Sequence, residues 1–202
     1  MVGFVFFPPS PRHIESALAR DLASIAGSRA LKVALSVDAS DDYLDEVMAA
    51  LQPDILQLHG RETPQRVAQI RARFGLPVMK ALGVSVEADF APLGAYEEVA
   101  DRILLDAKPP KDATRPGGNG HAFDWSLLTD RGFHRPWMLS GGLTCDTVAS
   151  AVAATRPPGI DVSSGVESSP GVKDSALIAA FVARARAAAA GLTPLGSARE
   201  SA

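Results

Sequence analysis

The sequence contains little that would bind a metal or crosslink the chain. It has one cysteine, Cys145, so no disulfide can form within the chain. No cluster of histidine and cysteine has the spacing of a structural zinc site, and we expect no metal.

Excess positive charge and long apolar runs are lacking as well. The formal net charge of −3 leaves no basic field to hold nucleic acid or an anionic membrane surface. No apolar run approaches the roughly 20 residues that cross a bilayer, and the first residues lack the basic region and cleavage site of a signal peptide. We therefore expect a cytoplasmic protein that binds neither nucleic acid nor a membrane.

What is present is an ordinary globular composition. Apolar residues make up 47% and charged residues 21% of the 202 residues, which suits one domain with a sizeable core. We expect this single domain to span residues 1–190. The segment 191–202 is small and polar, and we expect it to be a flexible C-terminal tail.

Segments typical of strands and helices alternate along the chain. Short apolar runs alternate with segments whose apolar residues recur at helical spacing. The predicted strands cover residues 1–6, 31–37, 54–60, 76–82, 101–107, 136–140 and 159–163, and the predicted helices cover residues 14–27, 41–52, 63–75, 88–99, 125–132, 146–155 and 174–191. This gives seven strands, each followed by a helix.

Such alternation indicates a parallel sheet covered by helices. A doubly wound open sheet and a closed (β/α)8 barrel both fit the pattern. No G-x-G-x-x-G motif follows the first strand, which argues against the dinucleotide-binding form of the open sheet. We predict an α/β fold of the TIM-barrel class, a (β/α)8 barrel in which the first β/α unit is absent from this chain.

Two turns rich in small residues follow the last two predicted strands. They read LSGGLTCDTV and DVSSGVESSPGVKD. Glycines let backbone amides approach an anion, and a short helix beginning near Gly165 would direct its amides to the same point. For either turn alone, a simple tight turn is the favoured explanation. Together, after the last two strands of a barrel, they predict a phosphate site.

Three further polar groups lie where predicted strands end. Asp106 precedes a glycine-rich loop, and it is either a partly desolvated acid that gives a proton to a leaving oxygen or a residue that fixes the loop. Gln57 and His59 share one face of their strand. His59 is either a base or substrate donor, or a neutral histidine that holds the neighbouring loop.

Arg12 follows the first strand in the motif SPR. The nearby prolines restrict its backbone, and a guanidinium held stiffly is suited to bind a carboxylate through two hydrogen bonds. The alternative is a surface salt bridge.

Five segments also carry a resemblance to a known family. In chain order they read GFVFFPPSPRHI, LQLHGRET, LLDAKPP with GGNGHAFDW, LSGGLTCDTVASAV and GIDVSSGVESSPGVKD. Together they resemble phosphoribosylanthranilate isomerase, a (β/α)8 enzyme of tryptophan biosynthesis. The resemblance implies the Amadori rearrangement of N-(5-phosphoribosyl)anthranilate, a phosphorylated small molecule, to 1-(2-carboxyphenylamino)-1-deoxyribulose 5-phosphate, without a cofactor.

The resemblance implies roles for individual residues. Asp106 matches the general acid that protonates the furanose ring oxygen, and Arg12 matches the arginine that receives the anthranilate carboxylate. The residues expected at the substrate are Arg12, Gln57, His59, Gly118 and Gly120, and those expected at the phosphate are Gly141, Gly142, Ser164 and Gly165.

The general base of the family has no counterpart in this sequence. Family members begin with a strand that ends in a K-x-C-G type motif, whose cysteine takes the proton from C2 of the sugar, and neither that strand nor its helix precedes Met1. Cys145 is not expected to replace it, because it lies at the start of a later helix, beside a phosphate turn. We therefore expect the chain as written to be a poor catalyst.

Two other functions stay open. One is a truncated, catalytically impaired barrel that binds phosphorylated ligands and needs its missing N-terminal segment or a partner. The other is a different phosphate-sugar barrel, such as an epimerase or indole-glycerol-phosphate synthase, although the lysine and metal-ligand patterns of those reactions are lacking. The sequence does not indicate an oligomeric state.

Overall fold

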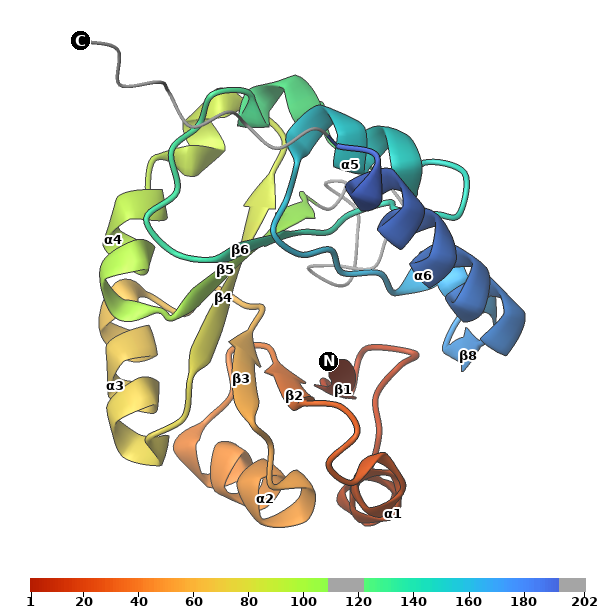
Figure 1. The fold of residues 1–202 in the computed structure, drawn as a ribbon. Helices are drawn as coiled ribbons and strands as arrows, with labels where there is room; N and C mark the ends of the chain where they lie inside the picture. The colour runs from red at the N-terminus through yellow and green to blue at the C-terminus, as the bar shows by residue number, and fades with distance from the viewer. Residues whose placement is uncertain (109–121, 193–202) are drawn as a thin grey trace, which may run out of the picture.

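Six parallel strands form the central sheet of the computed structural model, which describes residues 1–108 and 122–192. They are β1 (Val2–Phe6), β2 (Lys32–Ser36), β3 (Ile55–Leu58), β4 (Val78–Val84), β5 (Arg102–Ala107) and β6 (Trp137–Leu139), paired in chain order (Figure 1). The first six predicted strands are thereby confirmed. Because every pair is parallel, the carboxyl ends of the strands meet at one edge of the sheet.

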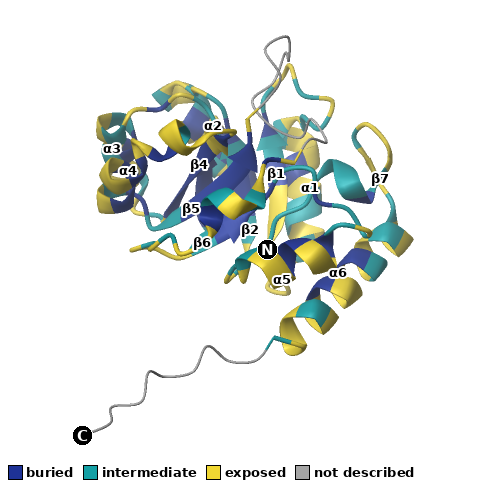
Figure 2. Ribbon diagram, turned by 90° about the horizontal axis from the view of Figure 1, so that it is seen from above, coloured by how far each residue is buried: buried dark blue, intermediate teal, exposed yellow. Residues whose placement is uncertain are grey.

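Helices cover the outer face of this sheet. They are α1 (Ser16–Ala26), α2 (Asp41–Leu51), α3 (Pro64–Phe74), α4 (Leu93–Val99), α5 (Val148–Thr155) and α6 (Ser175–Ala190). Figure 2 shows the buried sheet in the interior and the exposed faces of the helices outside it. Local sequence explains several boundaries: Ser40 and Thr63 cap the amino ends of α2 and α3, and Gly75 ends α3 in the left-handed conformation.

The seventh predicted strand, residues 159–163, is not a regular strand. It contributes one parallel bridge, between Ile160 and Leu139 of β6. β6 is only three residues long, and Pro157 and Pro158, which lack an amide hydrogen, precede the bridge. The prediction of seven regular strands is therefore wrong, although this segment occupies the seventh position, beside β6.

Two predicted helices are shorter than expected. The segment 88–99 divides at Pro92 into the 3-10 helix η1 (Glu87–Phe90) and α4, because proline cannot donate in a helix interior. The segment 125–132 forms only the 3-10 helix η2 (Trp125–Leu128), and Asp130, with a φ of 58°, lies in the left-handed region just beyond it.

An antiparallel hairpin near the C-terminal end of the fold was not predicted from the sequence. The 3-10 helix η3 (Ser164–Val166) leads into β7 (Glu167–Ser169), which pairs with β8 (Val172–Lys173). These strands are too short to show the alternation by which strands are predicted. The segment was expected to be only a turn.

Apolar side chains pack on both faces of the curved sheet. The larger cluster lies between the sheet and its helices, and a smaller one covers the other face. The smaller cluster consists of Val33, Ile55, Met79, Ala81, Leu104 and Met138. Burial on both faces is the pattern expected for a parallel sheet.

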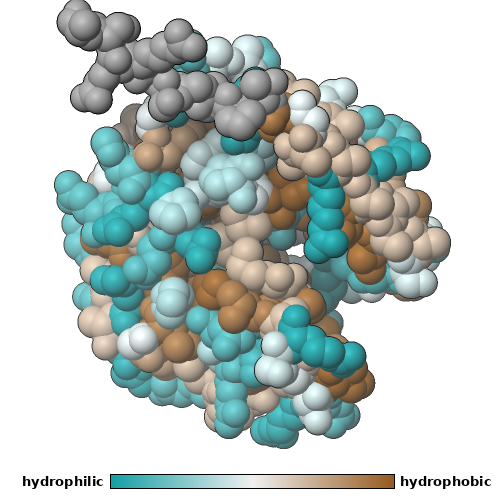
Figure 3. All heavy atoms as spheres, in the orientation of Figure 1, coloured by the Kyte–Doolittle hydropathy of each residue, from teal (hydrophilic) through white to brown (hydrophobic). Residues whose placement is uncertain are grey.

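The sheet does not close into a complete barrel within the described residues, because no strand joins β1 to the segment around Ile160. Among the described residues, β1 has β2 as its only partner strand, and its other edge carries a single bridge from Val5 to His13. The segment around Ile160 ends the other side. In Figure 3 the surface is hollowed here, between the α6 side and the side of β1 and α1. The tail predicted for residues 191–202 lies outside the described residues from 193 onward.

A buried ion pair anchors the loop after β3. The side chains of Lys80 and Glu62 are each only 2% exposed, and Nζ lies 2.8 Å from Oε2. The ammonium group also donates to the carbonyl oxygens of Leu58 at 3.1 Å and Gly60 at 2.7 Å. Because an unpaired charge is costly in the interior, this pair fixes the loop that carries His59.

We expect Lys80→Met to lower the free energy of unfolding by about 3 to 5 kcal/mol, because the Glu62 carboxylate would stay buried without its countercharge. Lys108→Met is the control: Lys108 is 53% exposed in its ion pair with Asp89, and exposed pairs contribute about 1 kcal/mol or less. Urea unfolding followed by circular dichroism measures both variants. Equal losses would contradict the anchoring role of Lys80.

Candidate active site

Three polar side chains form a hydrogen-bonded row at the carboxyl ends of β3 and β5. Gln57 Nε2 lies 3.0 Å from His59 Nδ1, and His59 Nε2 lies 3.1 Å from Asp106 Oδ2. Asp106 Oδ1 also accepts a hydrogen bond from the Ala107 amide at 2.9 Å. The structure thus brings together three residues that the sequence singled out separately.

The row fixes where the proton of His59 lies. An amide nitrogen can only donate, so Gln57 Nε2 donates to His59 Nδ1. A neutral imidazole then carries its hydrogen on Nε2 and donates it to Asp106. Asp106 therefore receives two N–H donors, one at each oxygen of its carboxyl group.

The contact between His59 and Asp106 spans the middle strand. β4 lies between β3 and β5, and its residue in register with Asp106 is Gly83. A β-carbon at Gly83 would meet Lys108 at 3.6 Å, an ordinary contact distance. The side chain of His59 contacts Gln57 and the candidate acid, and its role stays a prediction.

Asp161 is a second carboxyl group near Asp106, and it was not singled out from the sequence. It follows the bridge at Ile160 and accepts a hydrogen bond from Ser140 Oγ at 3.0 Å. Desolvation raises the pKa of Asp161, the negative charge of Asp106 raises it further, and the hydrogen bond from Ser140 only partly offsets them. A carboxyl group in the middle of the predicted apolar strand 159–163 was the signal that could have identified it.

Two turns lie against each other at the same edge of the sheet. Gly141 and Gly142 follow β6, and the predicted short helix near Gly165 is η3. A β-carbon at Gly165 would overlap the carbonyl oxygen of Leu143, so this approach requires glycine. Ser164 begins η3. The four residues expected at a phosphate thus belong to two turns in contact.

Arg12 forms a buried salt bridge and does not lie on the surface. Its side chain is 9% exposed, and Nε and Nη2 donate to the two carboxylate oxygens of Glu167 at 2.6 and 2.7 Å. Burial raises the pKa of Glu167, but hydrogen bonds from Arg12 and Lys173 outweigh it and hold the pKa at about 2. Glu167 was not singled out from the sequence, because only the fold brings it to Arg12.

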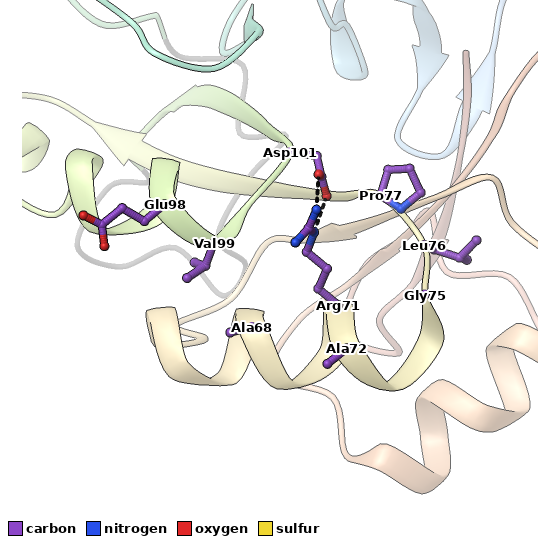
Figure 4. Close-up of a pocket in the computed structure, with 9 residues that line it drawn as sticks. All are labelled: Ala68, Arg71, Ala72, Gly75, Leu76, Pro77, Glu98, Val99 and Asp101. Atoms are coloured by element: carbon purple, nitrogen blue, oxygen red, sulfur yellow. Dashed lines mark hydrogen bonds and ion pairs between the residues drawn. The ribbon is translucent and has the colours of Figure 1, made fainter.

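A hollow lies at the opposite edge of the sheet. It measures about 490 Å³ and lies among the ends of α3 and α4 and the residues that precede β4 and β5 (Figure 4). Arg71 and Asp101 form a two-point ion pair in its wall, with distances of 2.9 and 2.8 Å. Sites in folds of this kind lie at the carboxyl ends of the strands, so this hollow is not the candidate site.

The remaining sequence candidates lie elsewhere. Gly118 and Gly120 are outside the described residues. Cys145 Sγ lies 3.5 Å from the carbonyl oxygen of Leu177, so the thiol contacts α6. Within residues 1–108 and 122–192, no three histidine, cysteine or acidic side chains gather as metal ligands, and no helix is both long and apolar enough to cross a membrane.

Replacing Asp161 by asparagine tests its raised pKa. A carboxyl group with a raised pKa contributes stability below its ordinary value of 3.8, and this contribution is lost as the pH rises through the folded-state value. Asp161→Asn cannot titrate. We therefore expect the free energy of unfolding of this variant to rise relative to that of the wild type as the pH increases above about 4. Urea unfolding at fixed pH measures the difference.

The control for this experiment is Asp45→Asn, whose carboxyl group is 48% exposed on α2. Its difference from the wild type should change little over the same pH range. A pH-independent difference for Asp161→Asn would show that burial does not raise this pKa.

Comparisons with known proteins agree with one another. Residues 1–184 match the family model described as N-(5'phosphoribosyl)anthranilate (PRA) isomerase. An N-(5'-phosphoribosyl)anthranilate isomerase of Rhodopseudomonas palustris (strain BisB18) is 61% identical over 187 residues, which are 93% of this chain and 86% of the relative.

Solved structures give the same result. The crystal structure of phosphoribosyl anthranilate isomerase from Thermotoga maritima superposes with a TM-score of 0.81 at 39% identity, covering 92% of this chain and 87% of that one. A phosphoribosyl anthranilate isomerase in complex with reduced 1-(o-carboxyphenylamino)-1-deoxyribulose 5-phosphate superposes with a TM-score of 0.77 at 36% identity, with the same coverage. The fold is that of the TIM-barrel family, and the chain belongs to the N-(5'-phosphoribosyl)anthranilate isomerase family.

Proposed function

We propose that this protein isomerises N-(5-phosphoribosyl)anthranilate to 1-(2-carboxyphenylamino)-1-deoxyribulose 5-phosphate in tryptophan biosynthesis, within the cytoplasm. The observation that carries the proposal is the environment of Asp106. This carboxyl group is 4% exposed, lies at the carboxyl end of β5, and receives N–H donors from His59 and Ala107. The family membership of the chain supports the same reaction.

The chemistry begins with a proton from Asp106. In its protonated form it gives a proton to the furanose ring oxygen, the bond between C1 and that oxygen breaks, and the anilino nitrogen supplies the electron pair of a C1=N Schiff base. Removal of the proton at C2 then gives an enolamine, which tautomerises to the ketone. The two N–H donors at Asp106 stabilise the carboxylate that the first step leaves.

The other predicted residues bind the substrate in this proposal. Arg12 receives the anthranilate carboxylate, and the turns with Gly141, Gly142, Ser164 and Gly165 receive the phosphate through backbone amides. Gln57 and His59 lie on the side of the general acid. Gly118 and Gly120, which are outside the described residues, are proposed to lie near the substrate.

We expect Asp106→Asn to lower kcat by about 10²- to 10⁴-fold with a small change in KM, because it removes general acid catalysis. The readout is conversion of N-(5-phosphoribosyl)anthranilate by the purified protein. Asp45→Asn, a change of the same kind on the exposed face of α2, should keep the wild-type rate. A wild-type rate in Asp106→Asn would exclude Asp106 as the acid.

We also propose that a further strand and helix complete the single domain of residues 1–190 as an eight-unit barrel. The two ends of the sheet leave hydrogen-bonding edges without a strand partner in the described structure. Apolar side chains border this side: Met1 and Val2 are 52% and 45% exposed, and Ile178 and Val182 of α6 are 41% and 40% exposed. The resemblance implies that such a strand would carry the cysteine that removes the C2 proton.

The closing unit is tested with the protein made from its native gene. We expect its intact mass and N-terminal residue to reveal a preceding strand and helix, and its kcat to exceed that of the 202-residue chain by about 10²-fold or more, because the general base is restored. Equal rates for the two forms would show that the extra unit is dispensable. Binding of the phosphorylated substrate without turnover by both forms would favour a ligand-binding barrel.

A further inference from the structure

Glu167 binds two cationic side chains at once. Oε1 accepts from Arg12 Nε at 2.6 Å and from Lys173 Nζ at 2.7 Å. Oε2 accepts from Arg12 Nη2 at 2.7 Å and from the Gly171 amide at 3.3 Å. With 4% of its side chain exposed, the carboxylate is almost fully enclosed by its partners. Such an arrangement fixes both cations relative to one another.

The two cations lead to different ends of the proposed site. Arg12 belongs to the loop after β1, where the anthranilate carboxylate is proposed to bind. Lys173 also donates to the carbonyl oxygen of Ser163 at 2.8 Å and to its hydroxyl oxygen at 3.3 Å. Ser163 directly precedes Ser164 and Gly165, the turn proposed to bind the phosphate. One carboxylate therefore links the supports of both ends of the substrate.

A second contact holds the same two segments together. Gly171 lies in the turn between β7 and β8 with a φ of 87°, and a β-carbon there would overlap the carbonyl oxygen of Pro11. The hairpin thus packs directly against the residue before Arg12. This contact does not depend on charge, so the hairpin and the loop after β1 stay adjacent when the charge of Glu167 is removed.

We propose that Glu167 is a positioning residue that couples the anthranilate end of the site to its phosphate end. Glu167 holds one edge of the Arg12 guanidinium, formed by Nε and Nη2, and so directs the Nη1 side to an incoming carboxylate. At the same time it holds Lys173 on Ser163. This inference rests on the proposed function, and Glu167 itself need not touch the substrate.

The charge of Glu167 is what this role requires. A glutamine of the same shape would offer one oxygen to two cations, and its amide group would face a guanidinium that can only donate. We therefore expect Glu167→Gln to release both cations from their fixed positions while the hairpin keeps its packing against Pro11.

The test compares a ligand that occupies one end of the site with a ligand that occupies both ends. Inorganic phosphate reports on the turn, and reduced 1-(o-carboxyphenylamino)-1-deoxyribulose 5-phosphate reports on both ends. Calorimetric titration gives Kd for each ligand in the wild type, Glu167→Gln, Arg12→Lys and Lys173→Met. Glu15→Gln is the matched control, because Glu15 is 85% exposed next to His13. Circular dichroism and Tm verify folding.

Coupling predicts a specific pattern of losses. Arg12→Lys should weaken only the analogue, and Lys173→Met should weaken phosphate. Glu167→Gln should weaken both ligands by about tenfold or more, raise KM, and leave kcat within about twofold. Glu15→Gln should resemble the wild type. If Glu167→Gln lowers Tm but leaves both affinities unchanged, or weakens only one ligand, the coupling role is overturned.

Two further outcomes keep this inference separate from the proposed function. A wild-type protein that binds phosphate but neither binds the analogue nor turns over substrate would refute the proposed function. In that case the link between Glu167 and the turn is judged on phosphate alone: a loss of affinity in Glu167→Gln supports it, and an unchanged affinity overturns it. Should Glu167→Gln fail to fold, the double variant Arg12→Lys/Lys173→Met decides. If the fold-losses of analogue affinity in Arg12→Lys and Lys173→Met multiply to give the loss in the double variant, coupling is refuted. A threefold or larger departure from that product supports coupling.

Discussion

The parallel pairing of β3, β4 and β5 is the constraint on which the site depends. It sets Gly83 of the middle strand in register with Asp106, and it brings His59, which directly follows β3, within 3.1 Å of the Asp106 carboxylate. A shift of one residue would turn Asp106 toward the helices and put Leu82 or Val84 in the place of Gly83. The position of the candidate acid is therefore a property of backbone hydrogen bonding.

The enclosed charged groups contribute more to fixing the positions of loops than to the free energy of folding. Removing ions from water costs several kcal/mol per ion, and a buried pair often does no more than offset that cost. Lys80 with Glu62, and Arg12 with Glu167, nevertheless occupy enclosed positions, each tying a loop at the carboxyl edge of the sheet to a neighbouring element. The penalty for separating either pair holds these loops in one arrangement, and a site built on loops needs that restraint.

Much of the fold could be read from the sequence, because apolar periodicity and the capping residues Ser40 and Thr63 report on local structure. The same rules missed the hairpin after η3, since two- and three-residue strands leave no periodic signal. They overestimated the segment 159–163, because its neighbour β6 is only three residues long and two prolines precede its single bridge. Strand-end position identified Asp106, whereas Asp161 lies in the middle of a predicted strand. Glu167 could not be identified from its neighbours in the sequence. Its partner Arg12 lies 155 positions away, and local sequence patterns do not report contacts at that separation.

The separation of Arg12 and Glu167 along the chain determines when their contact can form during synthesis. Arg12 emerges early during synthesis, and 155 residues must follow before its partner exists, which takes roughly 8 to 30 s at ordinary translation rates. Contacts between distant residues are also the slow ones in folding. The end of the site that carries Arg12 is therefore completed only after Glu167 has been made, and a nascent chain whose first strands have already paired still lacks a finished binding surface.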